Sequence, residues 1–224
     1  MSFIETQDLC KIYGKDETEV DALKNVSIKI DKGEFVAITG PSGSGKSTLL
    51  HMLGAVDKPT SGKVIIDGID VFNAKERELA IFRRRKIGFV FQFYNLIPVL
   101  NAEENITIPI KLDGRDVEKE YLEEIIETLG LGDRRKHFPN QLSGGQQQRI
   151  AIGRALINRP AIILADEPTG SLDTKNSREI ISLLKLAVKK YGQTLILITH
   201  DPSIAAQADR TIFMEDGKVR GDDR

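Results

Sequence analysis

The sequence is poor in cysteine, has no long apolar segment and carries almost no net charge. Its single cysteine, Cys10, excludes an internal disulfide and a cysteine-based metal site, and is typical of a reducing compartment. No segment approaches the roughly 18 to 20 consecutive apolar residues that cross a bilayer, and the N-terminus lacks a secretory pattern. A net charge of -1 provides no global positive field for nucleic acid or anionic lipid. We therefore expect a cytoplasmic chain without a nucleic-acid partner, with Cys10 as a small buried hydrophobe.

Length and pattern predict one α/β domain. The 224 residues, 40% hydrophobic, are enough to bury a sizeable core. Apolar runs alternate with helical spacing in the second half, which predicts a parallel sheet with helices on its faces. The basic run 83–86 is interpreted as a solvated helix end, and 93–141 as a helical insertion. The expected strands are 3–12, 26–30, 34–39, 63–66, 69–72, 161–165 and 194–199, with a tight turn at Asp67-Gly68 and helices at about 146–157, 175–190 and from Asp201-Pro202.

A complete phosphate-binding loop follows the expected strand 34–39. Backbone amides of such a loop wrap a β-phosphate, Lys46 reaches the β and γ oxygens, and Ser47 offers a hydroxyl to Mg²⁺. Glycine lets the backbone approach the anion, and the following helix presents its positive end. A plain glycine turn is the alternative, and the flanking strand and helix argue against it. The loop consists of Gly40, Pro41, Ser42, Gly43, Ser44, Gly45, Lys46 and Ser47.

Two adjacent carboxylates end the apolar strand 161–165. Ligands of open parallel sheets bind beyond the carboxyl ends of the strands, so both should lie beside the phosphate loop. Asp166 is the candidate Mg²⁺ partner, and Glu167 the candidate to orient or deprotonate the attacking water. An exposed acidic loop after a core strand is the alternative.

Two further polar residues directly follow apolar strands, and this position makes them candidate site residues. His200 follows 194–199 and could hydrogen-bond a γ-phosphate and hold the water or Glu167 in line. Gln92 follows the run 87–91 and could reach the metal or the water. The alternatives are a structural histidine, as we interpret His51 and His137, and a polar residue that merely ends a strand.

A second glycine-rich segment, Leu142, Ser143, Gly144, Gly145 and Gln146, needs its own explanation because one phosphate loop is enough for one nucleotide. Exposed amides at a helix start, with the Ser143 hydroxyl as donor, suit a γ-phosphate. With this segment the whole chain resembles the ATP-binding subunits of ABC transporters. The economical interpretation is that the segment of one copy closes over a nucleotide held by the loop of another copy.

The resemblance implies a role for each matching residue. Tyr13 resembles the aromatic residue that stacks on adenine, although a core aromatic is the alternative. Gly40 to Thr48 match the Walker A loop, Gln92 the Q-loop glutamine and His200 the switch histidine. Asp166 and Glu167 match the Walker B pair. Residues 171–173 match the D-loop, of which Asp173 is expected to contact nucleotide, while Ser143, Gly144, Gly145 and Gln146 are the signature contacts. Ser47, Gln92 and Asp166 are the implied Mg²⁺ ligands.

The resemblance also implies an architecture and a partner. It implies a P-loop NTPase core with an N-terminal antiparallel β subdomain, with residues 1–92 and 150–224 as the core and 93–149 as a helical subdomain, all in one domain 1–224. The stretch 91–98, with Glu104, Asn105 and Pro109, is most similar to the lipoprotein-release, macrolide-export and peptide-export subfamily. Its ATPases pair with a separate membrane permease, here expected to dock on 93–109, so the chain should be peripheral on the inner face of the membrane.

We expect two copies to bind two MgATP, close, hydrolyse ATP and reopen, driving the permease to export or extract lipoprotein, macrolide or peptide. The alternative hypothesis is an ATPase of the same family that does not drive transport. Chromosome-organising relatives need a long coiled coil, and no sustained heptads occur between Thr48 and Leu142. Translation-associated relatives carry two cassettes, and one is present here. A complex that transmits force or signals without moving a substrate stays an open alternative.

Overall fold

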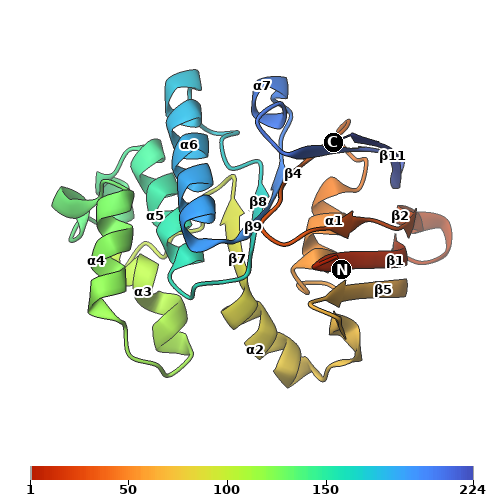
Figure 1. Cartoon of the computed structure of the whole chain (residues 1–224), viewed down its shortest axis with the longest axis horizontal. Helices are drawn as coiled ribbons and strands as arrows, with labels where there is room; N and C mark the ends of the chain where they lie inside the picture. Colours follow the sequence, from red (N-terminus) through yellow and green to blue (C-terminus); the bar gives the residue numbers. More distant parts are fainter. Residues whose placement is uncertain (1, 224) are drawn as a thin grey trace. The chain divides into compact units, whose positions relative to one another are not determined.

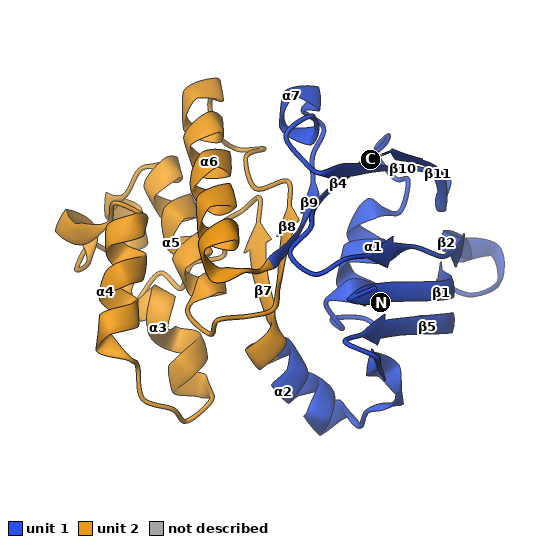
Figure 2. Cartoon of the chain, in the orientation of Figure 1, with its two compact units in different colours: residues 1–83, 194–224 blue, residues 84–193 orange. Residues whose placement is uncertain are grey.

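The computed structural model describes residues 2–223, which divide into two compact units (Figures 1 and 2). The first unit holds residues 2–83 and 194–223, and the second holds 84–193. Each unit is a part of the chain whose residues contact mainly one another. The subdomain boundaries expected from the resemblance, 1–92 with 150–224 and 93–149, stay a prediction.

The first unit contains an antiparallel sheet and a set of parallel strands. Strands β2, β1, β5 and β6 pair in that order, with β3 on β1, while β10, β4 and β9 run parallel and β11 is antiparallel to β10. Its elements are β1 (Ile4–Tyr13), η1 (Asp16–Thr18), β2 (Val20–Val26), β3 (Lys29–Ile30), β4 (Phe35–Thr39), α1 (Lys46–Leu53), β5 (Ser61–Ile66), β6 (Ile69–Asp70), η2 (Val71–Asn73), β9 (Thr194–Ile198), α7 (Pro202–Ala205), β10 (Arg210–Glu215) and β11 (Lys218–Asp223), and α2 (Glu76–Lys86) begins in it.

The second unit is a layer of helices on a parallel strand pair. Strand β7 runs beside β8, and α5 packs on β7 and on α3, α4 and α6. Its elements are β7 (Ile87–Phe91), α3 (Ala102–Leu112), α4 (Lys119–Thr128), η3 (Gly132–Arg134), η4 (Pro139–Gln141), α5 (Gly144–Leu156), β8 (Ile162–Asp166) and α6 (Thr174–Tyr191). The predicted α/β class with parallel strands and an N-terminal antiparallel sheet is therefore confirmed.

Buried apolar residues explain the two best predicted strands. All four residues from Ile162 to Ala165, and every residue of β9, are buried, as expected for parallel strands packed on both faces. The hairpin between β5 and β6 turns at Asp67 (φ 52°) and Gly68 (φ 76°), the conformation that a tight two-residue turn requires. Asp201 caps α7, since its side chain accepts the Ser203 N–H and Pro202 is the first helical residue. These predictions are confirmed.

Several details differ from the prediction. The expected strand 69–72 ends at Asp70, and residues 71–73 form the short helix η2, which Asp70 caps by accepting the Phe72 N–H. The expected strand 26–30 is two strands, β2 and β3, because the buried Thr6 hydroxyl donates to the Val26 carbonyl and accepts from the Ile28 N–H at the break. Cys10 is half-buried rather than buried, and its Sγ lies 3.1 Å from Asn25 Oδ1 at an irregular part of β1. The hairpin of β10 and β11 was not predicted.

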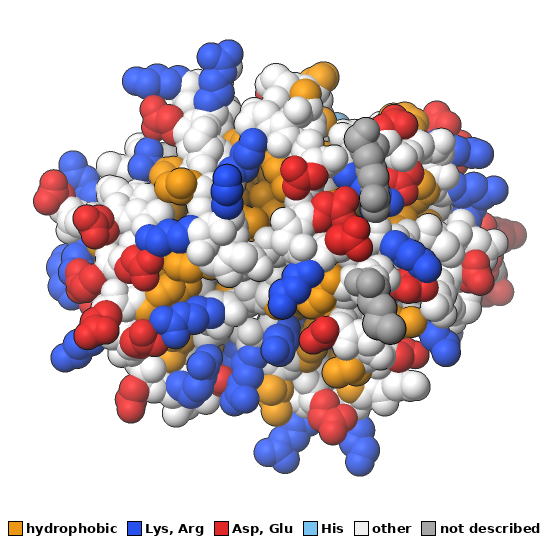
Figure 3. All heavy atoms as spheres, viewed as in Figure 1, with side chains coloured by type: hydrophobic (Ala, Val, Ile, Leu, Met, Phe, Trp, Pro, Cys, Tyr) orange, Lys and Arg blue, Asp and Glu red, His pale blue; other side chains and the backbone are white. Residues whose placement is uncertain are grey.

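Charged side chains of both signs are interspersed over the face drawn in Figure 3, with no extended region of one sign. The basic run 83–86 does end a helix, α2, but two of its arginines are not simply solvated. Arg84 and Arg85 bind the carboxylate of Asp113 at 2.8 and 2.9 Å, and Arg115 binds it at 2.7 Å. This carboxylate therefore ties the end of α2 to the end of α3.

The three arginines make the stability of the fold sensitive to acid through Asp113. Their hydrogen bonds, that of Arg85 first, lower the pKa of Asp113 from 3.8 to about 2. A lowered folded-state pKa contributes stability above pH 3.8 that is lost as the pH falls towards 2. We expect Asp113→Asn to lower the urea midpoint at pH 7, and the difference from the wild type to shrink between pH 4 and pH 2. A difference that stays constant over this range would contradict the assignment.

Candidate functional site

The loop between β4 and α1 has the backbone of an anion cradle. Gly40 (φ 138°) and Gly45 (φ 95°) adopt conformations that L side chains rarely allow. A Cβ at Gly40 would lie 2.0 Å from the Met214 carbonyl oxygen, and one at Gly45 would lie 2.3 Å from that of Ala22. Both positions therefore require glycine for the loop to wrap as it does, which a plain turn does not.

Lys46 occupies the first turn of α1 with its ammonium turned into the loop. The side chain is buried, 6% exposed, and Nζ donates to the carbonyl oxygens of Gly40 at 3.0 Å and Pro41 at 2.7 Å. Ser44 Oγ lies 3.4 Å away. A buried ammonium held inside a glycine-rich loop by two backbone carbonyls is suited to bind phosphate oxygens.

Tyr13 ends β1 beside the partner strand β2. Its ring is 40% exposed, its hydroxyl donates to Asp57 Oδ2 at 2.8 Å, and Lys11 Nζ lies 4.7 Å from the ring centroid. Burial, followed by the hydrogen bond to Asp57, raises the pKa of Tyr13, so the hydroxyl stays a donor at neutral pH. Val20, directly opposite Tyr13 and 59% exposed, adds apolar surface that the sequence pattern did not single out.

His200 follows β9, the parallel neighbour of β4. Ile38 pairs with Ile198, and the Thr199 N–H donates to the Ile38 carbonyl at 3.3 Å. His200 and the start of the phosphate loop therefore leave neighbouring strands at the same sheet edge, as the prediction requires. His200 is exposed there.

In the second unit, Gln92 and Glu167 leave the paired ends of β7 and β8. Phe91 lies opposite Asp166 in the register, so the next residue of each strand is one of the two candidates. Glu167 has a φ of 45°, a conformation unusual for a residue with a side chain, and its carbonyl accepts the Gly170 N–H at 3.0 Å. A Cβ at Gly170 would lie 2.7 Å from Gln92 Nε2, so the Gln92 side chain rests on this turn.

The second glycine-rich segment caps α5. The Gln146 N–H donates to Ser143 Oγ at 3.3 Å, and the Ser143 N–H donates to Gln146 Oε1 at 2.9 Å. The helix begins at Gly144, two residues earlier than expected, because this reciprocal cap draws both glycines into the first turn. The Ser143 hydroxyl accepts from the helix and keeps its proton to donate, as a phosphate contact requires.

Close neighbours explain the two glycines of this segment. A Cβ at Gly144 would lie 2.6 Å from the Tyr94 hydroxyl, and one at Gly145 would lie 3.0 Å from Asn176 Oδ1. Asp173 caps α6 by accepting the Asn176 N–H at 2.8 Å, a bond that lowers the pKa of its carboxyl. The structure thus gives Asp173 a capping role, and its contact with nucleotide stays a prediction.

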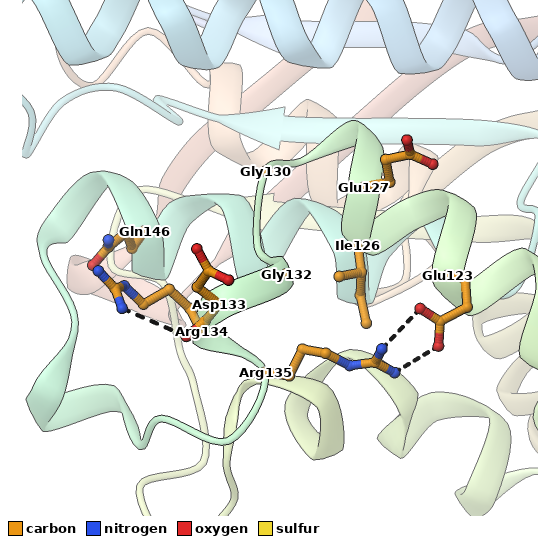
Figure 4. Close-up of a pocket in the computed structure, with 9 residues that line it drawn as sticks. All are labelled: Glu123, Ile126, Glu127, Gly130, Gly132, Asp133, Arg134, Arg135 and Gln146. Carbon is orange, nitrogen blue, oxygen red and sulfur yellow. Dashed lines mark hydrogen bonds and ion pairs between the residues drawn. The ribbon is translucent and has the colours of Figure 1, made fainter.

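A pocket of 640 Å³ lies beside the start of α5, bounded by α4 and η3 (Figure 4). Figure 4 shows the Arg135 guanidinium turned towards the Glu123 carboxylate, with two hydrogen bonds of 2.8 and 2.7 Å. Among the predicted site residues that the structure describes, Gln146 alone lines this pocket, and the other predicted nucleotide contacts lie elsewhere.

The structure therefore groups the predicted residues by unit. The first unit carries Tyr13, the phosphate loop, Thr48 and His200. The second carries Gln92, Asp166, Glu167, Asp173 and the signature segment 142–146. A nucleotide-binding loop after a buried parallel strand, followed by a helix, defines the class of P-loop nucleotide-binding proteins.

Comparison with known proteins identifies the family within this class. Residues 23–170 match the family described as "ABC transporter". An uncharacterized ABC transporter ATP-binding protein of Thermotoga maritima is 50% identical over 99% of this chain and 95% of its own length. The chain belongs to the ABC transporter family, and it is an ATP hydrolase of that family.

Two named relatives agree with the subfamily expected from the sequence. The lipoprotein-releasing system ATP-binding protein LolD of Bordetella pertussis is 42% identical over 98% of this chain and 96% of its own length. The macrolide export ATP-binding/permease protein MacB of Bdellovibrio bacteriovorus is 46% identical over 99% of this chain, which spans 34% of that relative.

Solved structures confirm the fold. The ATP-binding cassette MJ0796, in a dimeric post-hydrolysis state bound to ADP and Pi, matches with a TM-score of 0.90 and 44% identity over 99% of this chain and 98% of that one. Another dimeric structure of MJ0796, described as a bacterial ABC transporter cassette, gives a TM-score of 0.89 at 46% identity, over 99% of this chain and 98% of that one.

Proposed function

We propose that two copies of this chain bind two ATP molecules between them, each held by the phosphate loop of one copy and the signature segment of the other. The observation that carries the proposal is that the chain builds two separate segments suited to anions: the loop around Lys46 and the helix start capped by Ser143. The relatives of known structure are described as dimers, which supports it. The γ-phosphate then bridges the copies, and its loss on hydrolysis releases them.

Each predicted residue has a role in this proposal. Amides of Gly40 to Thr48 and the Lys46 ammonium hold the phosphates, while Ser143, Gly144, Gly145 and Gln146 approach from the other copy. Asp173 lies beside them at the start of α6. Glu167 orients or deprotonates the attacking water, with His200 and Gln92 holding the water and the γ-phosphate in line.

Mg²⁺ is the metal that fits the oxygen donors of the site. Ser47 offers a hydroxyl, Gln92 an amide oxygen and Asp166 a carboxylate, a hard-oxygen set of the kind that Mg²⁺ takes together with phosphates and water. Within residues 2–223, no group of three or more His, Cys, Asp or Glu side chains is placed to hold a metal. When bound, the ion would neutralise charge on the β- and γ-phosphates.

A membrane permease is the proposed partner, and we propose that it docks on the second unit at residues 93–109. In this segment Phe93 is 72% exposed, Ile97 38% and Val99 79%, so three large apolar side chains face solvent. Among residues 2–223, no helix combines the length and hydrophobicity needed for a membrane span. The MacB relative is described as an ATP-binding/permease protein of which this chain matches one third, which supports an ATPase acting on a membrane part.

We place the chain on the inner face of the cell membrane, where its permease exports or extracts lipoprotein, macrolide or peptide. The alternative is a complex that transmits force or signals across the membrane without moving a substrate. The test is to identify the integral membrane protein that co-purifies with the chain and to express the chain with and without this permease. We expect MgATP hydrolysis by the purified chain and its recovery in the membrane fraction only with the permease. Failure to hydrolyse MgATP would overturn the proposal.

Tyr13 gives a prediction on nucleotide affinity. If its ring stacks on adenine, Tyr13→Ala removes an interaction worth about 1 to 3 kcal/mol and raises the ATP Kd by roughly 5- to 150-fold. Tyr13→Phe keeps the ring, loses only the bond to Asp57, and should stay within about threefold of the wild type. Calorimetric titration of all three proteins tests this, and equal affinities for Tyr13→Ala and the wild type would contradict stacking.

A further inference from the structure

One side chain outside the predicted site touches the backbone beside both Gln92 and Glu167. Gln148 lies in α5, two residues beyond the signature segment, and is fully buried. Its Nε2 donates to the Phe91 carbonyl at 3.3 Å and to the Pro168 carbonyl at 2.7 Å. Phe91 directly precedes Gln92, and Pro168 directly follows Glu167. A single amide group therefore bridges the two loops that leave β7 and β8.

Both protons of the Gln148 amide group are used in hydrogen bonds. An Nε2 carries two protons, and each has one carbonyl to bind. The opposite orientation would place Oε1 against two carbonyl oxygens, so the contacts fix which atom points at the loops. Within residues 2–223, Gln148 Oε1 is a buried atom without a hydrogen-bond partner, a cost that the fold tolerates at this position.

The turn that Gln148 holds is strained. Glu167 has a positive φ, which non-glycine residues rarely adopt, and it precedes a proline, which restricts its backbone further. Such conformations persist only where the surroundings hold them. The bond from Gln148 to the Pro168 carbonyl acts on the peptide group that follows Pro168, within the turn that contains Glu167.

Other contacts hold the loop that follows β7. Ser171 Oγ lies 3.1 Å from both the Gln92 carbonyl and the Tyr94 hydroxyl. A hydroxyl has one proton, so if Ser171 donates to the carbonyl, the Tyr94 hydroxyl donates to Ser171. Arg154, also from α5, donates to the Tyr94 and Asn95 carbonyls at 2.7 and 2.6 Å. Residues 91–95 are thus held along their backbone.

We infer that Gln148 is a positioning residue, which sets the spacing between Gln92 and Glu167 and ties both to the helix that the signature segment caps. The inference rests on the proposed function, because it concerns the geometry of ATP hydrolysis. Gln148 does not touch nucleotide. Its effect passes through the two carbonyls that it holds.

The chain offers a matched control for this inference. Gln193 is also buried, at 2% exposed, and its Nε2 donates to the Pro160 carbonyl at 2.9 Å. Within the described residues its Oε1 is likewise buried without a partner. Pro160 precedes β8, at the end of the strand opposite to Glu167. Gln193→Met therefore removes a similar buried amide bond away from the predicted site, and Gln148→Met removes one beside it.

The test measures MgATP hydrolysis and thermal unfolding of the full chain and both variants. We expect both to lose a similar roughly 3 to 10 °C in Tm. Only Gln148→Met should lower kcat, by about 10- to 100-fold with the KM for ATP within about threefold, because misplaced groups affect the chemical step more than binding. Equal kcat values for the two variants, or a Gln148→Met loss confined to KM, would overturn the inference.

Two further outcomes are distinguishable. If Gln148→Met does not fold, Gln148→Asn is measured instead, because it keeps the amide on a side chain shorter by one carbon. A wild-type kcat for Gln148→Asn would overturn the inference. A loss of kcat at unchanged KM would support it. If the wild-type chain itself does not hydrolyse MgATP, the proposed function fails and this inference fails with it. A wild-type chain that is active, with unaffected Gln148 variants, contradicts the inference alone.

Discussion

Replacing Glu167 with glutamine is expected to abolish ATP turnover while ATP binding and ATP-dependent association persist. The amide has the size of the carboxylate but cannot take a proton from water. Glu167 stands at the end of β8, beside the predicted metal ligand Asp166, in the strained turn that Gln148 holds. General-base catalysis contributes about 10² to 10⁴ in rate, so kcat should fall at least about 100-fold. Phosphate release at saturating MgATP measures this.

The control for this change is Glu118→Gln. Glu118 forms an exposed ion pair with Arg159 at 2.8 Å, and such pairs contribute little to stability or activity. Its kcat should match that of the wild type. A Glu167→Gln chain that still turns over ATP within a few-fold of the wild type would show that another group activates the water.

Lys46→Ala is expected to eliminate ATP binding at millimolar nucleotide or below. The buried ammonium now donates to the Gly40 and Pro41 carbonyls, and on binding it would exchange these for phosphate oxygens. Two charge-assisted hydrogen bonds of about 1.5 to 3 kcal/mol each correspond to a rise in Kd of roughly 10² to 10⁴. Calorimetric titration with ATP tests this.

Lys58→Ala is the matched control for Lys46→Ala. Its ammonium is 63% exposed and pairs with Glu76 at 3.4 Å, away from the phosphate loop. It should bind ATP with wild-type affinity. If Lys46→Ala folds, as circular dichroism would show, and binds ATP as tightly as Lys58→Ala does, the phosphate loop is not the nucleotide site.

Motifs that depend on local sequence could be predicted closely. The strands that end at Thr39, Asp166 and Ile198 are continuous apolar runs, bounded by glycine, proline or polar residues, and they were placed within one residue at their C-terminal ends. The loop glycines follow from the same local rule, because a backbone that wraps an anion needs positive φ. Local pattern was therefore enough to place the carboxyl end of each of these strands, which the predicted residues follow.

Elements whose boundaries depend on distant contacts could not be predicted as well. The break between β2 and β3 is set by Thr6, some twenty residues earlier in the chain. The hairpin of β10 and β11 could have been predicted from Asp216-Gly217, which is the same residue pair as in the Asp67-Gly68 turn. Asp216 has a φ of 49° and Gly217 a φ of 75°. Gln148 carries no sequence signal, since its two carbonyl partners lie 57 and 20 residues away.

The most direct test of the central claim mixes two variants that each lack one half of the nucleotide site. Lys46→Ala removes the phosphate-loop half, and Ser143→Arg blocks the signature half. Each is made with Glu167→Gln and its own tag, and association is measured by pull-down between tags with light scattering. If the copies share their sites, each mixed pair holds one site with both changes and one with neither.

We predict that neither variant associates alone with MgATP, and that the mixture forms ATP-dependent pairs of twice the chain mass that ADP does not support. Pairs should also form between Glu167→Gln copies without further changes. A mixture that stays monomeric in MgATP, while those Glu167→Gln copies associate, would contradict a nucleotide site shared between two copies.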